Sequence, residues 1–184
     1  DNLELNDLRV GSDGSLIFIG EVYYVHVVTT YSSKGGSTTT YYYHYDDILV
    51  TRIAPNGELD WMRKLPKSQV GANRGRSGMS YKYMWDEATQ THYFVFLDNF
   101  KNMNLDINKA PEVHQDGAGG YLTAYKVTDK DGTVGKVSIL DTRDANGIKV
   151  SQFNVDRLVK SENGEFLMES YKKKKEDVLF KVKL

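Results

Sequence analysis

The first strand–turn–strand unit of the chain reads LRVGSDGSLIF over residues 8–18. A short apolar run precedes the pair Asp13-Gly14, and a more strongly apolar run follows it. An Asx-Gly pair offers the positive φ angles that a two-residue hairpin turn demands. The stretch therefore predicts two antiparallel strands joined by a tight turn.

The same pattern returns along the chain. Residues 158–168 read LVKSENGEFLM, again with an Asx-Gly pair between two runs of strand-forming residues. A second motif, DILVTRI over residues 47–53 followed by Asn56-Gly57, is matched by YLTAYKV over residues 121–127 followed by Asp131-Gly132. Repetition of this kind predicts a domain built from recurring β-units.

The third copy of that strand, DVLFKVK, comes at the end of the sequence over residues 177–183. We therefore expect an all-β fold: one β-repeat domain over residues 1–184, made of about three four-stranded antiparallel units near residues 8–66, 79–142 and 153–184. The last unit has room for three strands, so Leu179 and Phe180 are expected on a strand with an exposed edge. The strands of the first two units are expected near residues 8–12, 15–29, 41–53, 59–64, 84–85, 93–97, 121–127 and 136–140.

Two segments favour sheets that are covered on both faces. Residues 16–19, LIFI, and residues 93–97, YFVFL, are apolar without the alternation of polar and apolar residues. A strand buried on both faces needs cover above and below it, which the neighbouring blades of a β-propeller supply. The pattern predicts a partial, propeller-like stack, with a two-layer β-sandwich as the alternative.

Composition excludes several classes of function. The 24 Lys and Arg residues balance the 25 Asp and Glu residues, so the chain has no overall field to attract nucleic acid. There is no cysteine, which excludes disulfides, thiolate nucleophiles and cysteine-based zinc sites. No apolar run approaches the ~18 residues that a membrane span needs.

The sequence begins with Asp1 rather than Met, and we expect it to be a fragment of a longer, processed chain. Propellers typically contain ~4–8 blades, more than the three units found here. Either missing upstream blades or a homodimer of about six units is then expected to complete the ring.

The stretch from Asp47 to Trp61 resembles a blade repeat of many secreted bacterial β-propeller proteins. In that repeat a strand of the form D-x-x-V-x-K-x-D is followed by an N-G turn and a Trp. Arg52 and Ala54 stand here where the repeat more often has Lys and an acidic residue. The resemblance implies a propeller-type architecture and an extracytoplasmic location, in the periplasm or at the cell surface, and it implies no particular activity.

Catalytic motifs are absent from the sequence. The serine-hydrolase elbow, the H-E-x-x-H metal motif and the phosphate-binding fingerprints are not found, and the carboxylates are scattered. We therefore predict no catalytic residue, no metal site and no cofactor, although enzymatic activity stays an open alternative. The segment DKDG at residues 129–132 lacks two ligands of a calcium loop and is interpreted as a hairpin turn.

The glycine-rich segment over residues 71–78 is a candidate anion site. Its backbone N–H groups could cradle an anion, assisted by Arg74 and Arg76. No helix follows to add its dipole, and a flexible connection between units is the alternative interpretation.

A long hairpin around Gly35-Gly36 carries the most unusual composition of the chain. Counting back from these glycines places His26 opposite His44 or Tyr45, a pair that could hold a transition metal or be an ordinary histidine pair. Tyr24 and Tyr42 belong to a tyrosine-rich set on both arms: Tyr23, Tyr24, Tyr31, Tyr41, Tyr42, Tyr43 and Tyr45. Tyrosine suits the recognition of proteins or sugars, and it also suits an ordinary two-stranded ribbon.

The function predicted from these observations is a non-catalytic extracytoplasmic binding or scaffold module of the β-propeller type, with a protein or a glycan as its partner. The predicted ligand-binding residues are Tyr24, His26, Tyr42, His44, Arg74 and Arg76. The alternative is a carbohydrate-active or metal-assisted hydrolase with its site in a central channel. A third option is a structural fragment of a parent protein whose activity lies elsewhere.

Overall fold

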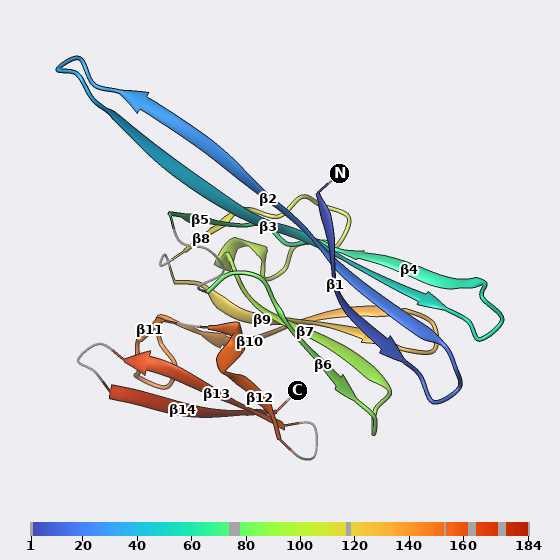
Figure 1. Ribbon diagram of the computed structural model, residues 1–184. Helices are drawn as coiled ribbons and strands as arrows, with labels where there is room; N and C mark the ends of the chain where they lie inside the picture. The colour runs from blue at the N-terminus through green and yellow to red at the C-terminus, as the bar shows by residue number, and fades with distance from the viewer. Residues whose placement is uncertain are drawn as a thin grey trace.

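The computed structural model describes residues 2–73, 78–116, 119–152, 154–161, 165–172 and 176–183. These residues form three largely antiparallel sheets, which follow one another along the chain except that residues 114–115 return to the first sheet (Figure 1). The helical content of the described part is two 3₁₀ turns, η1 (Phe100–Asn102) and η2 (Val155–Arg157). No helix there is long and apolar enough to cross a membrane. The prediction of an all-β fold is confirmed.

The first sheet contains six strands rather than the four expected for the first unit. They are β1 (Leu3–Val10), β2 (Leu16–Tyr31), β3 (Ser37–Ile53), β4 (Leu59–Leu65), β5 (Gln69–Ala72) and β8 (His114–Gln115). Strand β3 is long enough to pair with β4 along its second half and with β5 along its first half. The two-residue strand β8 then pairs in parallel with β5.

The second sheet is a four-stranded antiparallel meander. Its strands are β6 (Lys82–Asp86), β7 (Thr91–Asp98), β9 (Tyr121–Thr128) and β10 (Val134–Asp141), in the order β10-β9-β7-β6. All four lie where the sequence predicts strands, because each contains several β-branched or aromatic residues, which favour extended backbone.

The third sheet is three strands wide. Its strands are β11 (Val150–Gln152), β12 (Leu158–Lys160), β13 (Glu165–Lys172) and β14 (Glu176–Lys183). Strands β11 and β12 pair with opposite ends of the same edge of β13, while β14 takes the other edge. In the described part of the chain β14 has no second neighbour, and Leu179 is 72% exposed. The expected exposed edge is therefore confirmed for these residues.

Turn geometry differs from the expected two-residue form. In the first sheet, Gly11 N–H bonds to Ser15 O and Gly14 N–H bonds to Gly11 O, so three residues form the loop. Gly14 has φ +87°, the left-handed position that a three-residue loop of this type needs. The Asp13 side chain stabilises it by accepting hydrogen bonds from the backbone N–H and the hydroxyl of Ser15. Asx side chains favour such local bonds, which the pair rule alone does not anticipate.

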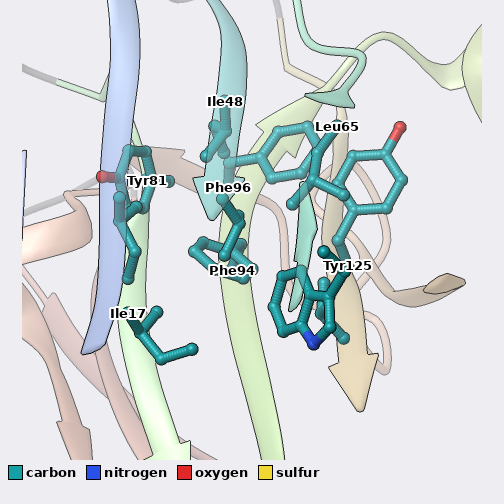
Figure 2. Packing of buried hydrophobic residues seen from close by; sticks show 11 residues of the cluster. Ile17, Ile48, Leu65, Tyr81, Phe94, Phe96 and Tyr125 are labelled. Atoms are coloured by element: carbon teal, nitrogen blue, oxygen red, sulfur yellow. The ribbon is translucent and has the colours of Figure 1, made fainter. Parts of the chain in front are cut away.

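The first and second sheets pack face to face on a shared apolar core (Figure 2). From the first sheet come Ile17, Ile19, Ile48, Val50, Trp61 and Leu65, and from the second sheet and the segment before it come Tyr81, Phe94, Phe96, Tyr125 and Val127. Each fully buried large side chain contributes about 1.5–3 kcal/mol, so this layer is a main source of stability.

A second core lies between the second and third sheets. It joins Met84, Tyr93, Val95, Leu97, Leu122 and Ala124 to Val155, Leu158, Phe166 and Met168. Strand β7 therefore presents Phe94 and Phe96 to one core and Tyr93, Val95 and Leu97 to the other. The run YFVFL is buried on both faces, as predicted, because the second sheet is the middle layer of three. This stacking is consistent with both a partial propeller and a sandwich-like arrangement.

Candidate functional site

A long two-stranded ribbon extends from the first sheet. In Figure 1 the second half of β2 and the first half of β3 project far beyond the stacked sheets. The pairing is continuous from Tyr23 opposite Tyr45 to Tyr31 opposite Ser37. A three-residue loop over residues 33–35 closes it, with Ser32 N–H bonded to Gly36 O as Gly11 N–H is to Ser15 O in the first hairpin. We call residues 23–45 the ribbon.

The register places the two predicted histidines differently from the expectation. His26 lies opposite Tyr42, and His44 lies opposite Tyr24. The prediction that His26 faces His44 or Tyr45 is wrong, because the loop is centred on Lys34 and not between Gly35 and Gly36. The two imidazoles are instead diagonal neighbours on adjacent strands.

Tyr24, His26, Tyr42 and His44 nevertheless share one face of the ribbon. The rings of Tyr24 and His44 stack at 4.4 Å with an angle of 6° between their planes, and those of His26 and Tyr42 lie 6.3 Å apart. Because side chains alternate along a strand, this set lies on the opposite face from Tyr23 and Tyr45, whose rings are 5.0 Å apart.

A bulge decides which face of the ribbon each aromatic side chain takes. Along β3, Ile48 and Val50 face the second sheet, yet the buried residue three positions before Ile48 is Tyr45. One extra residue in β3, at Asp46-Asp47, changes the parity and turns His44 to the outer face. The sequence does not mark this bulge, because each half of β3 reads as an ordinary strand.

The base of this face carries polar groups. Burial, and then Asp46 through its charge and a hydrogen bond, raise the pKa of Tyr24 above its ordinary value. Asp46 also accepts a hydrogen bond of 3.0 Å from the Ser68 hydroxyl. Tyr24 is therefore a neutral phenol held in place at one end of the aromatic set.

Strand β5 holds the ribbon from one side and leads to the glycine-rich segment. Tyr42 to Tyr45 pair with β5, and Asn73 continues the contact by bonding to both backbone groups of Tyr41. Arg74 and Arg76 lie outside the described residues. Asn73, the described residue that precedes them, is thus next to the ribbon.

The opposite side of the ribbon is an unpaired strand edge. Strand β1 accompanies β2 as far as Val22, and Tyr23 N–H bonds to Asn2 O at 2.8 Å. Beyond that point no strand in the described part of the chain pairs with β2 on this side. In a strand, the backbone N–H and C=O groups of every second residue point to the same side. The backbone groups of Val25, Val27 and Thr29 therefore face the unpaired edge, as do those of Tyr31.

A buried ion pair fixes the foot of the ribbon. The Lys67 ammonium lies 2.7 Å from the Glu21 carboxylate and donates to Tyr45 O at 2.5 Å and to the Gln69 side chain at 3.1 Å. Glu21 also accepts a hydrogen bond of 2.6 Å from the Ser80 hydroxyl. Burial lowers the pKa of Lys67, against the pull of Glu21. The sequence held no signal for this network, because its members are far apart along the chain.

A second polar network lies between the first two sheets. The His92 side chain is fully buried, with Nε2 2.9 Å from Asp129 and Nδ1 3.0 Å from the Tyr83 hydroxyl. Arg52 continues the chain of contacts to Asp129, at 3.4 Å, and to Asp13, at 2.8 Å. Burial lowers the pKa of His92 although Asp129 opposes this, so His92 is neutral and the Tyr83 hydroxyl donates to Nδ1.

The second network has the connectivity of an acid–base relay without access to a substrate. Both ring nitrogens of His92 are occupied, and Trp61 and Trp85 cover its ring. The arrangement instead satisfies buried polar groups at the junction of two sheets. No group of three or more His, Asp or Glu side chains that could hold a metal ion is found in the described part of the chain.

Comparison of the chain with protein-family models, with curated proteins and with solved structures found no match.

Proposed function

We propose that this chain is a non-catalytic extracytoplasmic module of the β-propeller type that binds a protein partner through its ribbon. The observation that carries the proposal is the ribbon itself, which combines an exposed strand edge with a face formed by Tyr24, His26, Tyr42 and His44. The recurring strand motifs and the stacked sheets support the propeller assignment, and the resemblance to secreted repeat proteins supports the location.

The energetics of the ribbon favour a binding role. A two-stranded hairpin without a packed face is marginally stable in water. Yet His26 on the Tyr24 face is exposed, and on the opposite face Val27 is 49% exposed and Tyr31 is 83% exposed. A partner that covers these side chains would bury apolar surface at about 25 cal/mol per Å² and order an element that is otherwise solvated on both faces.

The geometry favours a protein over a glycan. A sugar ring binds on the open face of an aromatic ring, but the Tyr24 and His44 rings are stacked on each other at 4.4 Å. The unpaired edge of β2 offers the backbone N–H and C=O groups of alternate residues from Val25 onward. An extended segment of a partner can add there as a further strand, with the neighbouring side chains giving specificity.

The first test is capture of partners from a cell-surface extract, followed by affinity measurement with the purified partner. Tyr24→Ala combined with Tyr42→Ala should weaken binding at least ~10-fold, since buried interface tyrosines commonly contribute more than ~1 kcal/mol each. Phe100→Ala is the matched control, because Phe100 is a half-exposed aromatic residue outside the ribbon. Unchanged affinity in the double variant would contradict the proposal.

A backbone variant separates strand addition from other modes of binding. Val27→Pro removes an N–H group at the unpaired edge and leaves the hydrogen bonds between β2 and β3 in place. It should reduce binding as much as the double tyrosine variant does. Binding that survives Val27→Pro, together with a positive result on a glycan array, would replace the protein partner by a sugar.

A further inference from the structure

The outer face of the first sheet, the one opposite to the second sheet, is apolar and uncovered in the described part of the chain. It presents Leu3, Leu5, Leu8, Val10, Leu59 and Met62, which are 48–65% exposed. Register places them in rows with half-buried apolar residues of the inner strands, as in Leu8 opposite Phe18. We call this surface the outer leucine face.

Alternation explains why this face is so apolar. In β2, Ile17 and Ile19 point into the core, so Leu16 and Phe18 point outward. Most soluble sheets with one covered face carry polar residues on the other. Here both faces of β2 are apolar, which is the pattern that β7 shows between two cores. The outer leucine face therefore has the composition of a layer that another sheet covers.

The area is that of a protein interface. The six exposed side chains present on the order of 600 Å², which matches the largest patches that monomers usually expose (~300–600 Å²). A standard stable interface takes ~800 Å² from each partner, so a contact here would also include the half-buried residues between the six.

The charge pattern favours a second copy of this chain. Lys64 is the charged side chain that β4 contributes to this face, and it is already paired with Asp47 at 3.1 Å. Two copies can therefore meet about a two-fold axis without bringing unpaired like charges together. The third sheet of a second copy would pack less well on the outer leucine face. Its own outer face carries Glu165, Glu169 and Lys181, which would lose their water against leucines.

We propose that two copies of this chain form a symmetric dimer by packing their outer leucine faces against each other. The contact repeats between chains what the molecule does twice within itself, where apolar sheet faces stack in pairs. The dimer holds six sheets in all and leaves the edge of β2 along the ribbon available.

The test measures the oligomeric state of the 184-residue chain by native mass spectrometry and sedimentation velocity over a ~100-fold range of concentration. We expect a dimer. Leu5→Glu combined with Leu8→Glu should raise the dimer dissociation constant at least ~100-fold, because each substitution buries an unpaired carboxylate at the contact. Both leucines are more than half exposed in the single chain, so the substituted monomer should fold.

The matched control is Leu179→Glu on the outer face of the third sheet, where the leucine is 72% exposed. This variant should remain as dimeric as the parent. A monomer at all concentrations would overturn the proposal, and so would a dimer that Leu179→Glu dissociates, since that result would place the third sheet in the contact. If the double variant fails to fold, the single variant Val10→Glu repeats the test at the rim of the face.

Discussion

At the scale of single residues, buried polar side chains join strands that are far apart in the sequence. His92 on β7 reaches Asp129 after β9, and Asp129 in turn contacts Arg52 on β3. Lys67 reaches Glu21 across 46 positions of the chain. Each contact compensates the cost of removing a polar group from water at a sheet junction.

The histidines should make stability depend on pH between about pH 7.5 and about pH 5.5. Burial lowers the pKa values of His92 and His114 below the ordinary 6.5. These histidines then bind protons more strongly in the unfolded chain than in the folded one. The contribution of the neutral, buried imidazoles to the free energy of unfolding is therefore fully present above pH 6.5 and is lost as the pH falls. Each group contributes a slope of up to ~1.4 kcal/mol per pH unit. Urea unfolding at the two pH values measures it.

His92→Gln is the variant that assigns this slope. It removes one of the two titrating groups, so the difference in unfolding free energy between the two pH values should shrink. Asp13 does not contribute to the pH dependence in this range. Hydrogen bonds from Ser15, assisted by Arg52, lower the pKa of Asp13 to about 2. A slope unchanged by His92→Gln would mean that His92 does not titrate as its burial requires.

At the scale of elements, one strand can be apolar for different reasons along its length. Strand β7 alternates between two cores, whereas β2 leaves the core after Glu21 and becomes one arm of the ribbon. Both read as runs of strand-forming residues. The difference lies in what packs on them, which period-two alternation does not encode.

The core position of β7 predicts a large loss on truncation. Phe96→Ala should lower the free energy of unfolding by about 3–5 kcal/mol, because the removed ring leaves a cavity between the first two sheets. Val27→Ala, on the exposed ribbon, should change it by about 0.5 kcal/mol or less. Chemical denaturation of both variants measures the contrast. Equal losses at the two sites would contradict the assignment of core and ribbon.

At the scale of the whole molecule, the second sheet is shared by both apolar cores. Unfolding any one sheet exposes a face of its neighbour, so we expect a single cooperative transition. The two tryptophans, Trp61 and Trp85, lie between the first and second sheets and report on that junction. Far-UV circular dichroism reports on all three sheets.

Coincident denaturation curves from tryptophan fluorescence and circular dichroism are the expected result at a fixed protein concentration. A second transition seen by circular dichroism alone would mean that the third sheet, which contains no tryptophan, unfolds separately.

Much of the fold could be predicted because its signals are local. The positions of the strands follow from runs such as those around Phe18 and Phe94, and the glycine turns follow from Asx-Gly pairs. The candidate site was less predictable. Tyr24, His26, Tyr42 and His44 could be named from composition, but their pairing could not, since it depends on where a three-residue loop is centred.

The sequence by itself determined that this protein is all-β, where most of its strands lie and that β7 is covered on both faces, because these properties depend on neighbours two residues apart. Tertiary structure alone decided the added strands β5 and β8, the bulge at Asp46-Asp47, the ion pair of Lys67 with Glu21 and the bare outer leucine face. These features depend on which strands pair and which sheets pack against each other. Such contacts join residues far apart along the chain, and no local pattern encodes them.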